Sequence, residues 1–126
     1  MSTSSKKNLA QYERLAGTLR DRIAAGIYAR GDKLPSEMEL MDESGLSRST
    51  VRHALKVLVD EGLVRTERTA GRYVTEDRAL IEQLRAEAAR NLTAEFLEKM
   101  RGIGYGPEQA AALLERWNEK EGTNHD

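Results

Sequence analysis

Apolar residues recur at spacings of three and four along most of this chain, as they do in helices that bury one face. The first such stretch runs from Leu9 to Ile23 and is followed by Gly26, so we expect a helix that ends there. Residues 1–7 are rich in Ser, Thr and Lys without that spacing, and they are expected to be disordered. The segment 27–32 is expected to form a short strand and a turn.

Two capping signals indicate a pair of helices in the middle of the chain. Ser36 and Glu39 have the spacing of a capping box, which predicts a short helix that begins there and stops at Gly45. Ser47 is a second N-cap residue, so another helix follows after a tight turn and ends at Gly62. The buried stripe of that third helix is expected to consist of Val51, Ala54, Leu55 and Leu58.

The segment after Gly62 changes to the pattern of a β-hairpin. Residues 63–68 and 72–75 are expected to be two strands, joined by a turn at Thr69, Ala70 and Gly71. The predicted order is then helix, short strand, helix, tight turn, helix and hairpin. This order is that of a winged helix-turn-helix, in which the exposed face of the third helix fits the major groove of DNA and the hairpin is the wing.

The net charge of −1 conceals an uneven distribution. Residues 1–75 carry 13 Lys and Arg against 10 Asp and Glu, whereas residues 76–126 carry 7 against 11. Six basic residues and three acidic ones lie between positions 46 and 72. A locally basic surface indicates a nucleic-acid partner, although from charge alone a solubilising surface explains it equally well.

Composition excludes several classes of protein. A chain of 126 residues has room for one domain, or a small domain with an appendage. It has no Cys and two His, so disulfides and thiolate-bound zinc are excluded and no metal or cofactor is expected. No apolar run approaches the roughly 18–20 residues of a membrane span, which favours a cytoplasmic protein. No nucleophile–base pair or phosphate loop is present, so we expect no enzyme activity.

Four motifs in sequence order resemble those of the GntR family of bacterial transcription regulators. They are Leu34-Pro35-Ser36-Glu37, Gly45-Leu46-Ser47-Arg48-Ser49-Thr50-Val51-Arg52, Ala54-Leu55 and Glu61-Gly62-Leu63-Val64. The resemblance covers about residues 9–75 and implies a winged-helix dimer that binds double-stranded DNA. Two positions depart from the family pattern: Met38 stands where many members have a basic residue, and the wing lacks the first of two glycines.

Candidate DNA contacts follow from this resemblance and from the chemistry of the side chains. Arg48 and Arg52 match the arginines of the family's recognition helix, and arginine there suits a guanine edge or a phosphate. The resemblance places Ser36, Ser49 and Thr50 near the DNA backbone. For each arginine the alternative is an ordinary surface charge.

Three wing residues and one histidine complete the candidate DNA contacts. We expect Arg68 and Arg72 to reach phosphate or the minor groove beside Gly71, with pairing to Glu67 as the alternative for the two arginines. His53 is expected to contact phosphate or to be simply exposed.

The C-terminal segment, residues 76–126, predicts two more helices. Apolar residues at helical spacing between Leu80 and Phe96 indicate one, and the glycines between Gly102 and Gly106 end it. Pro107 suits the first position of the next helix. We expect an antiparallel helix pair with one apolar side left over, which a second copy covers. The candidate dimerisation residues are Leu84, Leu92, Phe96, Leu113, Leu114 and Trp117.

The complete prediction is a mostly α fold with a small β-hairpin wing, namely a winged helix-turn-helix followed by a two-helix dimerisation tail. The DNA-binding domain is expected over residues 1–75 and the tail over 76–126, which resembles the short YtrA-like class of the family. The predicted function is a homodimeric repressor that binds an inverted-repeat operator. The alternative is an architectural or plasmid-maintenance module without a discrete operator. The sequence says nothing about a small-molecule effector.

Overall fold

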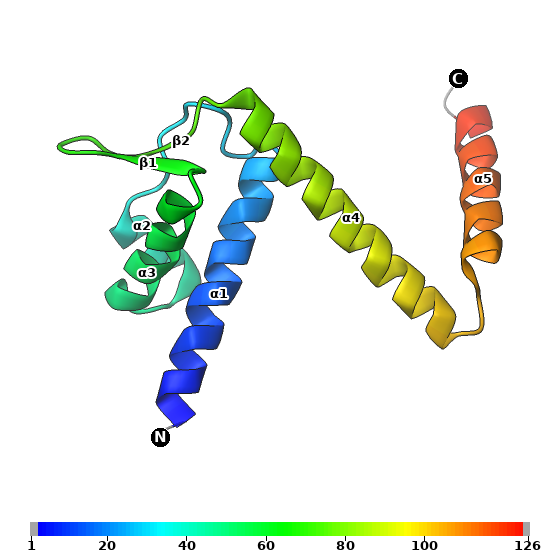
Figure 1. The fold of residues 1–126 in the computed structure, drawn as a ribbon, viewed down its shortest axis with the longest axis horizontal. Coiled ribbons are helices and arrows are strands. Elements are labelled where there is room, and N and C mark those ends of the chain that lie inside the picture. The colour runs from blue at the N-terminus through cyan, green and yellow to red at the C-terminus, as the bar shows by residue number, and fades with distance from the viewer. Residues whose placement is uncertain (1–2, 125–126) are drawn as a thin grey trace. The chain divides into compact units, whose positions relative to one another are not determined.

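The computed structural model describes residues 3–124, with side chains for residues 10–121. Its elements in chain order are α1 (Thr3–Ala24), α2 (Glu37–Ser44), α3 (Arg48–Asp60), β1 (Val64–Glu67), β2 (Gly71–Val74), α4 (Arg78–Gly102) and α5 (Pro107–Asn124). They form two compact units, which we call the head (residues 1–86) and the tail (residues 87–126). The described residues confirm the predicted fold class, with five helices and one two-stranded hairpin (Figure 1).

Helix α1 begins earlier than its apolar pattern suggested. It includes Thr3, within the segment 1–7 that was expected to be disordered. The physical reason is that neither Gly nor Pro occurs before Gly17, so nothing interrupts the helix on that side. Its other end is as expected, because Gly26 adopts a φ of +81° and the Ile27 amide turns back to the Arg22 carbonyl at 2.9 Å.

The segment 27–32 contains the predicted turn but not the predicted strand, so the strand prediction is wrong. It forms turns, in which Gly31 has a φ of +82° and the Asp32 carboxylate accepts a hydrogen bond from the Ala29 amide at 2.9 Å. The chain then runs beside β2, with an isolated bridge between Lys33 and Tyr73. The amides of Gly31 and Leu34 donate to the carbonyls of Val74 and Arg72 at 3.2 and 2.8 Å, and the Val74 amide donates to the Asp32 carbonyl at 2.8 Å. Tight turns before Lys33 keep this pairing too short for a regular strand.

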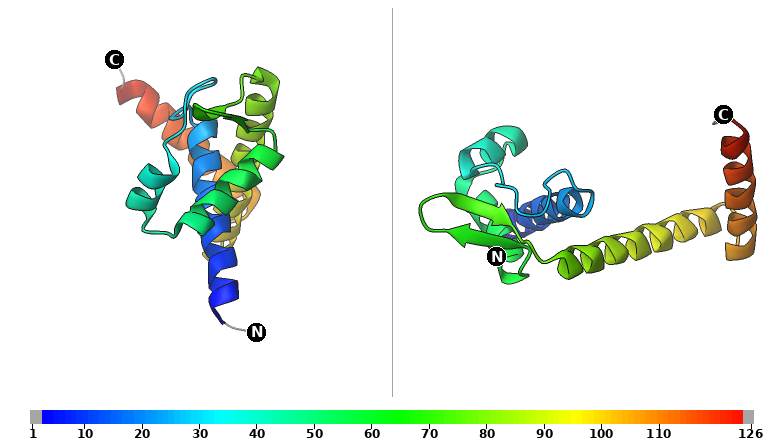
Figure 2. Two further views of the ribbon diagram at one scale, coloured as in Figure 1. Left: turned by 90° about the vertical axis from the view of Figure 1, so that its left-hand side faces the viewer. Right: turned by 90° about the horizontal axis from the view of Figure 1, so that it is seen from above.

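Helices α2 and α3 form the predicted helix-turn-helix. The capping box is present, with the Glu39 amide donating to Ser36 Oγ at 3.1 Å and the Ser36 amide donating to the Glu39 carboxylate at 2.9 Å. Gly45 ends α2 with a φ of +75°, which favours glycine, and Ser47 caps α3. Helix α3 packs against α1, α2 and β1 (Figure 1 and the left view of Figure 2), so its apolar face is held by three neighbours and its polar face is left exposed.

The core of the head is aliphatic and draws on every element of that unit. The predicted stripe of α3 is fully buried, and Leu19 and Ile23 of α1 pack with it. Strand β1 pairs with β2 in antiparallel register, with Val64 opposite Val74, and both are buried. Ile81 and Leu84 of α4 also belong to this core, so the compact unit continues beyond the expected boundary after Thr75.

The tail buries much less. Ala110 is its one buried hydrophobic residue among those described, and α4 and α5 are not packed along their length. The helix break is as expected, with turns between Gly102 and Pro107 and Pro107 at the first position of α5. A compact antiparallel pair therefore does not form in one chain, and more apolar surface is left uncovered than the pattern suggested. None of the helices in residues 3–124 combines the length and apolar character needed to cross a membrane.

Candidate nucleic-acid interface

The exposed face of α3 carries the residues predicted to read DNA. Arg48 and Arg52 project from its first two turns, with side chains 48% and 60% exposed. Ser49 is exposed beside them. The opposite face of α3 is buried in the core, so these side chains project into solvent from a rigid helix. Helix-turn-helix proteins present their recognition helix in this way.

A single carboxylate binds three arginines at this surface. Glu37, the first residue of α2, accepts hydrogen bonds from Arg52 Nε at 3.0 Å and Arg52 Nη2 at 2.9 Å. Arg48 Nη1 donates to the same side chain at 3.2 Å, and Arg72 Nη2 of the wing donates at 3.1 Å. The three arginines come from two elements, so Glu37 joins the recognition helix to the wing.

The electrostatics of Glu37 follow from these contacts. The hydrogen bonds from Arg52 lower its pKa most, burial opposes them, and Arg72 lowers it further, to about 2 from the ordinary 4.5. The same pairing raises the pKa of Arg52. The carboxylate is 14% exposed, so it lies below guanidinium groups that reach further into solvent. It is therefore ionised at every pH at which the protein is expected to work.

The wing places Arg72 at the interface and leaves Arg68 at its tip. Arg72 is 24% exposed and pairs with Glu37, whereas Glu67 pairs with Arg65 at 3.1 Å. The alternative in which Arg72 merely pairs with Glu67 is therefore not what the structure shows. Arg68 is exposed in the turn that connects β1 to β2. Gly71 has a φ of +101°, and a Cβ there would meet Lys33 Cε at 3.2 Å, so glycine suits this position.

A cleft of about 400 Å³ separates the start of α2 from the wing. Arg48 and Arg72 line it, together with Lys33 and the turn residues that precede Gly71. The three cationic side chains outnumber the one carboxylate in the lining, that of Glu37, so the cleft suits a phosphate backbone better than an apolar ligand. This cleft belongs to the same surface as the exposed face of α3.

Other predicted contacts have partners inside the head. Thr50 is 6% exposed and its hydroxyl lies 2.9 Å from Ser47 Oγ, so its side chain serves the cap of α3. The hydroxyl of Ser36 is the N-cap of α2. His53 stacks on Tyr12 of α1, with ring centroids 3.7 Å apart and planes 11° from parallel. These residues position the helices of the interface. Ser36 also lines the same cleft as Arg48 and Arg72, whereas Thr50 is buried and His53 is exposed beside Tyr12.

Glu37 is the member of this cluster to which the sequence analysis assigned no contact, although it ends the motif Leu34-Pro35-Ser36-Glu37. Its three partners follow it by 11, 15 and 35 residues, so no local spacing connects them. The signal available in the sequence is an acidic side chain beside a capping serine and ahead of a basic surface. That signal is shared by many helix N-termini, where acidic residues are common for reasons of helix stability.

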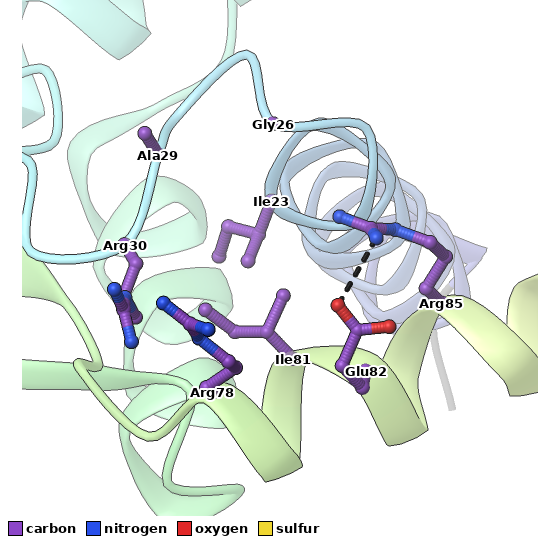
Figure 3. Close-up of a pocket in the computed structure, with 8 residues that line it drawn as sticks. All are labelled: Ile23, Gly26, Ala29, Arg30, Arg78, Ile81, Glu82 and Arg85. Carbon is purple, nitrogen blue, oxygen red and sulfur yellow. Dashed lines mark hydrogen bonds and ion pairs between the residues drawn. The ribbon is translucent and has the colours of Figure 1, made fainter.

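A second, smaller cleft of about 230 Å³ lies where α1 ends and α4 begins. Figure 3 shows Ile23 and Ile81 facing each other on its floor, with Arg30 and Arg78 side by side at one end. At the other end Arg85 pairs with Glu82 at 3.1 Å, and its Nε donates to the Ala24 carbonyl at 3.1 Å. These contacts fasten the first turns of α4 to the last turn of α1.

Five of the six predicted dimerisation residues are on the surface. Leu92 and Trp117 are each 66% exposed and Leu114 is 54% exposed, while Leu113 and Phe96 are 39% and 36% exposed. Leu84 is the exception, because it is 9% exposed and packs in the core of the head. The sequence assigned it to the tail because it shares one helical stripe with Leu92 and Phe96.

Comparison of the sequence with known proteins gives a consistent picture. Residues 11–74 match a family model described as bacterial regulatory proteins of the gntR family. The Exu regulon transcriptional regulator of Escherichia coli K12 is 36% identical over 107 residues, which are 82% of this chain and 37% of that protein. The chain spans about a third of the length of the curated relatives that it matches.

Comparison of the structure with solved structures extends the likeness. A GntR family transcriptional regulator from Listeria monocytogenes superposes with a TM-score of 0.73 and 31% identity, over 83% of this chain and 92% of that one. AraR(DBD), solved in complex with operator ORR3, superposes with a TM-score of 0.50 and 32% identity, over 52% of this chain and 78% of that one. The first match covers more of the chain than the residues of the family model.

Proposed function

Because the chain belongs to the gntR family of bacterial regulatory proteins, we propose that it regulates transcription by binding an operator as a homodimer. The observation that carries the proposal is the gathering of Arg48 and Arg52 of α3 and Arg72 of the wing around one carboxylate. AraR(DBD), which shares this fold, was solved with an operator. A recognition helix and a wing that share one cationic surface can contact base edges and backbone together.

The roles of the residues follow from their positions. Arg52 reads a guanine edge, since it is the most exposed of the three arginines that pair with Glu37. Arg48 and Ser49 contact the backbone or a neighbouring base at the entrance of the major groove. Arg68 and Arg72 contact sugar and phosphate from the wing. The protein then acts by occupying DNA in the bacterial cytoplasm, as a repressor without enzymatic activity.

Dimerisation is proposed for the tail. Leu92, Leu114 and Trp117 are more than half exposed, and large exposed apolar surfaces in soluble proteins mark sites of association. A two-fold contact between equivalent faces covers them without requiring any other protein. Two-fold symmetry implies an operator with inverted half-sites about one helical turn apart. The short YtrA-like class remains a prediction for this chain.

Selection of binding sites from random DNA with the purified protein tests the proposal. The expected result is one inverted repeat, which a footprint then shows as a discrete protected region. The Arg48→Ala/Arg52→Ala double variant should select no sequence while remaining folded, as judged by circular dichroism. Binding of the wild-type protein without sequence preference would favour an architectural role and overturn the proposed function.

A further inference from the structure

We propose that Glu37 is a positioning residue that sets sequence discrimination by holding Arg52 along one edge of its guanidinium group. The proposal rests on the proposed function and assigns a part to a side chain that would itself repel DNA. Glu37 contacts no base in this proposal. It acts through Arg52. Its charge weakens the binding of DNA of any sequence, and its contact with Arg52 improves the recognition of a particular base.

The geometry of the pair leaves the reading edge of Arg52 open. A guanidinium group has five N–H bonds, arranged as a side edge through Nε and an end edge through the two Nη atoms. Arg52 Nε and Nη2 donate to the two oxygens of Glu37 at 3.0 Å and 2.9 Å, which occupies the side edge. The end edge keeps the two parallel N–H bonds that match O6 and N7 of guanine. Both pairings can therefore exist at once.

The two partners differ in burial, which shows which of them lies nearer the solvent. The Glu37 side chain is 14% exposed and the Arg52 side chain is 60% exposed. The carboxylate is thus the inner partner and the guanidinium group the outer one, at the surface that faces the groove. A free arginine side chain loses conformational entropy when it binds DNA, and this loss weakens binding. Arg52 is already ordered by Glu37, so its entropy loss on binding is smaller.

Arg48 and Arg72 hold the carboxylate of Glu37 in place. Arg48 donates to Glu37 Oε1 at 3.2 Å and Arg72 donates to Glu37 Oε2 at 3.1 Å, so each carboxylate oxygen has a further partner. Glu37 is also the first residue of α2, whose cap is complete, so its backbone is fixed. A carboxylate held by two further arginines and a capped helix can orient Arg52, whereas a free surface glutamate could not.

The charge of Glu37 provides the distinguishing test. Its negative charge lies beside the cations that attract phosphate, so it weakens binding to DNA of any sequence. Removal of that charge should tighten non-specific binding and weaken specific binding. A side chain with a merely structural role would change both affinities in the same direction, since misfolding removes the whole surface.

The experiment compares the Glu37→Gln variant with the wild-type protein on the selected operator and on scrambled DNA at one salt concentration. We expect operator affinity to fall about tenfold, affinity for scrambled DNA to rise, and the ratio of the two to fall by more than tenfold. Asp42→Asn is the matched control, because it makes the same charge change on α2 and no interaction of Asp42 is found among the described residues. The control should leave the ratio unchanged.

A double-mutant cycle shows whether the effect passes through Arg52. In an Arg52→Ala background, Glu37→Gln should no longer reduce the ratio of operator to scrambled affinity. Glu37→Asp retains the charge and shortens the side chain, so it should reduce the ratio without raising the affinity for scrambled DNA. This variant keeps the test decisive if Glu37→Gln does not fold.

The outcomes separate the two proposals. A wild-type protein that selects no sequence would overturn the proposed function. A selective wild-type protein whose ratio survives in a folded Glu37→Gln variant would overturn this inference alone. A ratio that falls equally with and without Arg52 would also overturn it, because the effect would then not depend on the arginine.

Discussion

The head and the tail use the same kinds of residue in opposite ways. In the head, aliphatic side chains from α1, α3 and the hairpin are buried together, and its charged side chains pair with one another at the surface. In the tail, leucines and the tryptophan of α4 and α5 are exposed, and Ala110 is the one buried hydrophobic residue among those described. The head has one common core, whereas the tail exposes apolar side chains of the kind found at sites of association.

The difference shows that helical periodicity identifies an apolar face without identifying what covers it. Ile81 and Leu84 share one helix with Leu92 and Phe96, yet the first pair packs in the head and the second pair is at the surface. The following experiments test whether the head and the tail contribute separately to stability and to self-association.

Removal of the tail should have the largest effect on DNA binding and little effect on the head. A chain that ends after Ala86 keeps Ile81 and Leu84 in the core, so we expect it to stay folded and to be monomeric. Loss of the second half-site should lower operator affinity by about 10²-fold or more. Analytical ultracentrifugation and mobility shifts measure the two properties. A dimer that persists in this truncated chain would place the interface in the head.

A chain that ends after Thr75 is the informative comparison for that truncation. It lacks Ile81 and Leu84 as well as the hydrogen bond between Arg85 and the Ala24 carbonyl. We therefore expect it to be less stable than the chain that ends after Ala86, by urea denaturation. Equal stability of the two chains would show that the first turns of α4 contribute nothing to the head.

Matched leucine substitutions in the head and in the tail should affect different properties, namely stability and self-association. Leu55 is fully buried in α3, so Leu55→Ala should lower the free energy of unfolding by about 2–5 kcal/mol at any protein concentration. Leu114 is 54% exposed, so Leu114→Ala should leave the unfolding of the head within about 0.5 kcal/mol of the wild type. It should instead weaken self-association. Urea denaturation and sedimentation measure the pair, and a large loss of head stability from Leu114→Ala would contradict the division.

Arg72→Ala should have a smaller effect, because we propose that the wing contacts the DNA backbone and no base. We expect weaker binding to every DNA sequence and a salt dependence shallower by about one unit for each phosphate group that the variant no longer binds. Affinities over a series of salt concentrations provide the measurement. An unchanged salt dependence with a loss of operator affinity alone would show that Arg72 reads a base.

The smallest effect is expected from pH. The pKa of Glu37 is lowered from 4.5 to about 2 in the folded head, chiefly by Arg52, so its ionisation favours the folded state. This contribution is fully present above pH 4.5 and is lost as the pH falls towards 2. The stability difference between wild type and Glu37→Gln should therefore be constant at neutral pH and shrink in acid. Urea denaturation between neutral pH and about pH 3 tests this, and a difference that changes near neutrality would exclude Glu37 as its source.

The parts of the fold that could be predicted from the sequence are those with local signals. The capping box at Ser36, the left-handed glycine at Gly45 and the N-cap at Ser47 act within a few residues, and all were located correctly. The buried stripe of α3 is likewise a matter of spacing within one helix. The match of residues 11–74 to a family model agrees with the resemblance seen in the same segments.

The features that could not be predicted depend on residues far apart in the chain. Glu37 is joined to Arg72, 35 residues later, through the packing of the wing against the start of α2. His53 was expected to contact phosphate or to be exposed, and it is exposed, but its stacking on Tyr12 of α1 had no signal in the sequence. In both cases the contact depends on the tertiary structure, so it could not be predicted from the spacing of residues in the sequence.

Trp117, the only tryptophan in the sequence, makes the tail spectroscopically distinct from the head. Its side chain is 66% exposed on α5. Intrinsic tryptophan fluorescence therefore reports on the tail alone, while the head contributes tyrosine emission. Burial of the indole in a contact between two copies would shift the emission to shorter wavelength, whereas binding of DNA to a protein that is already dimeric would leave it unchanged. The unmodified protein thus contains a probe that can follow assembly separately from operator binding.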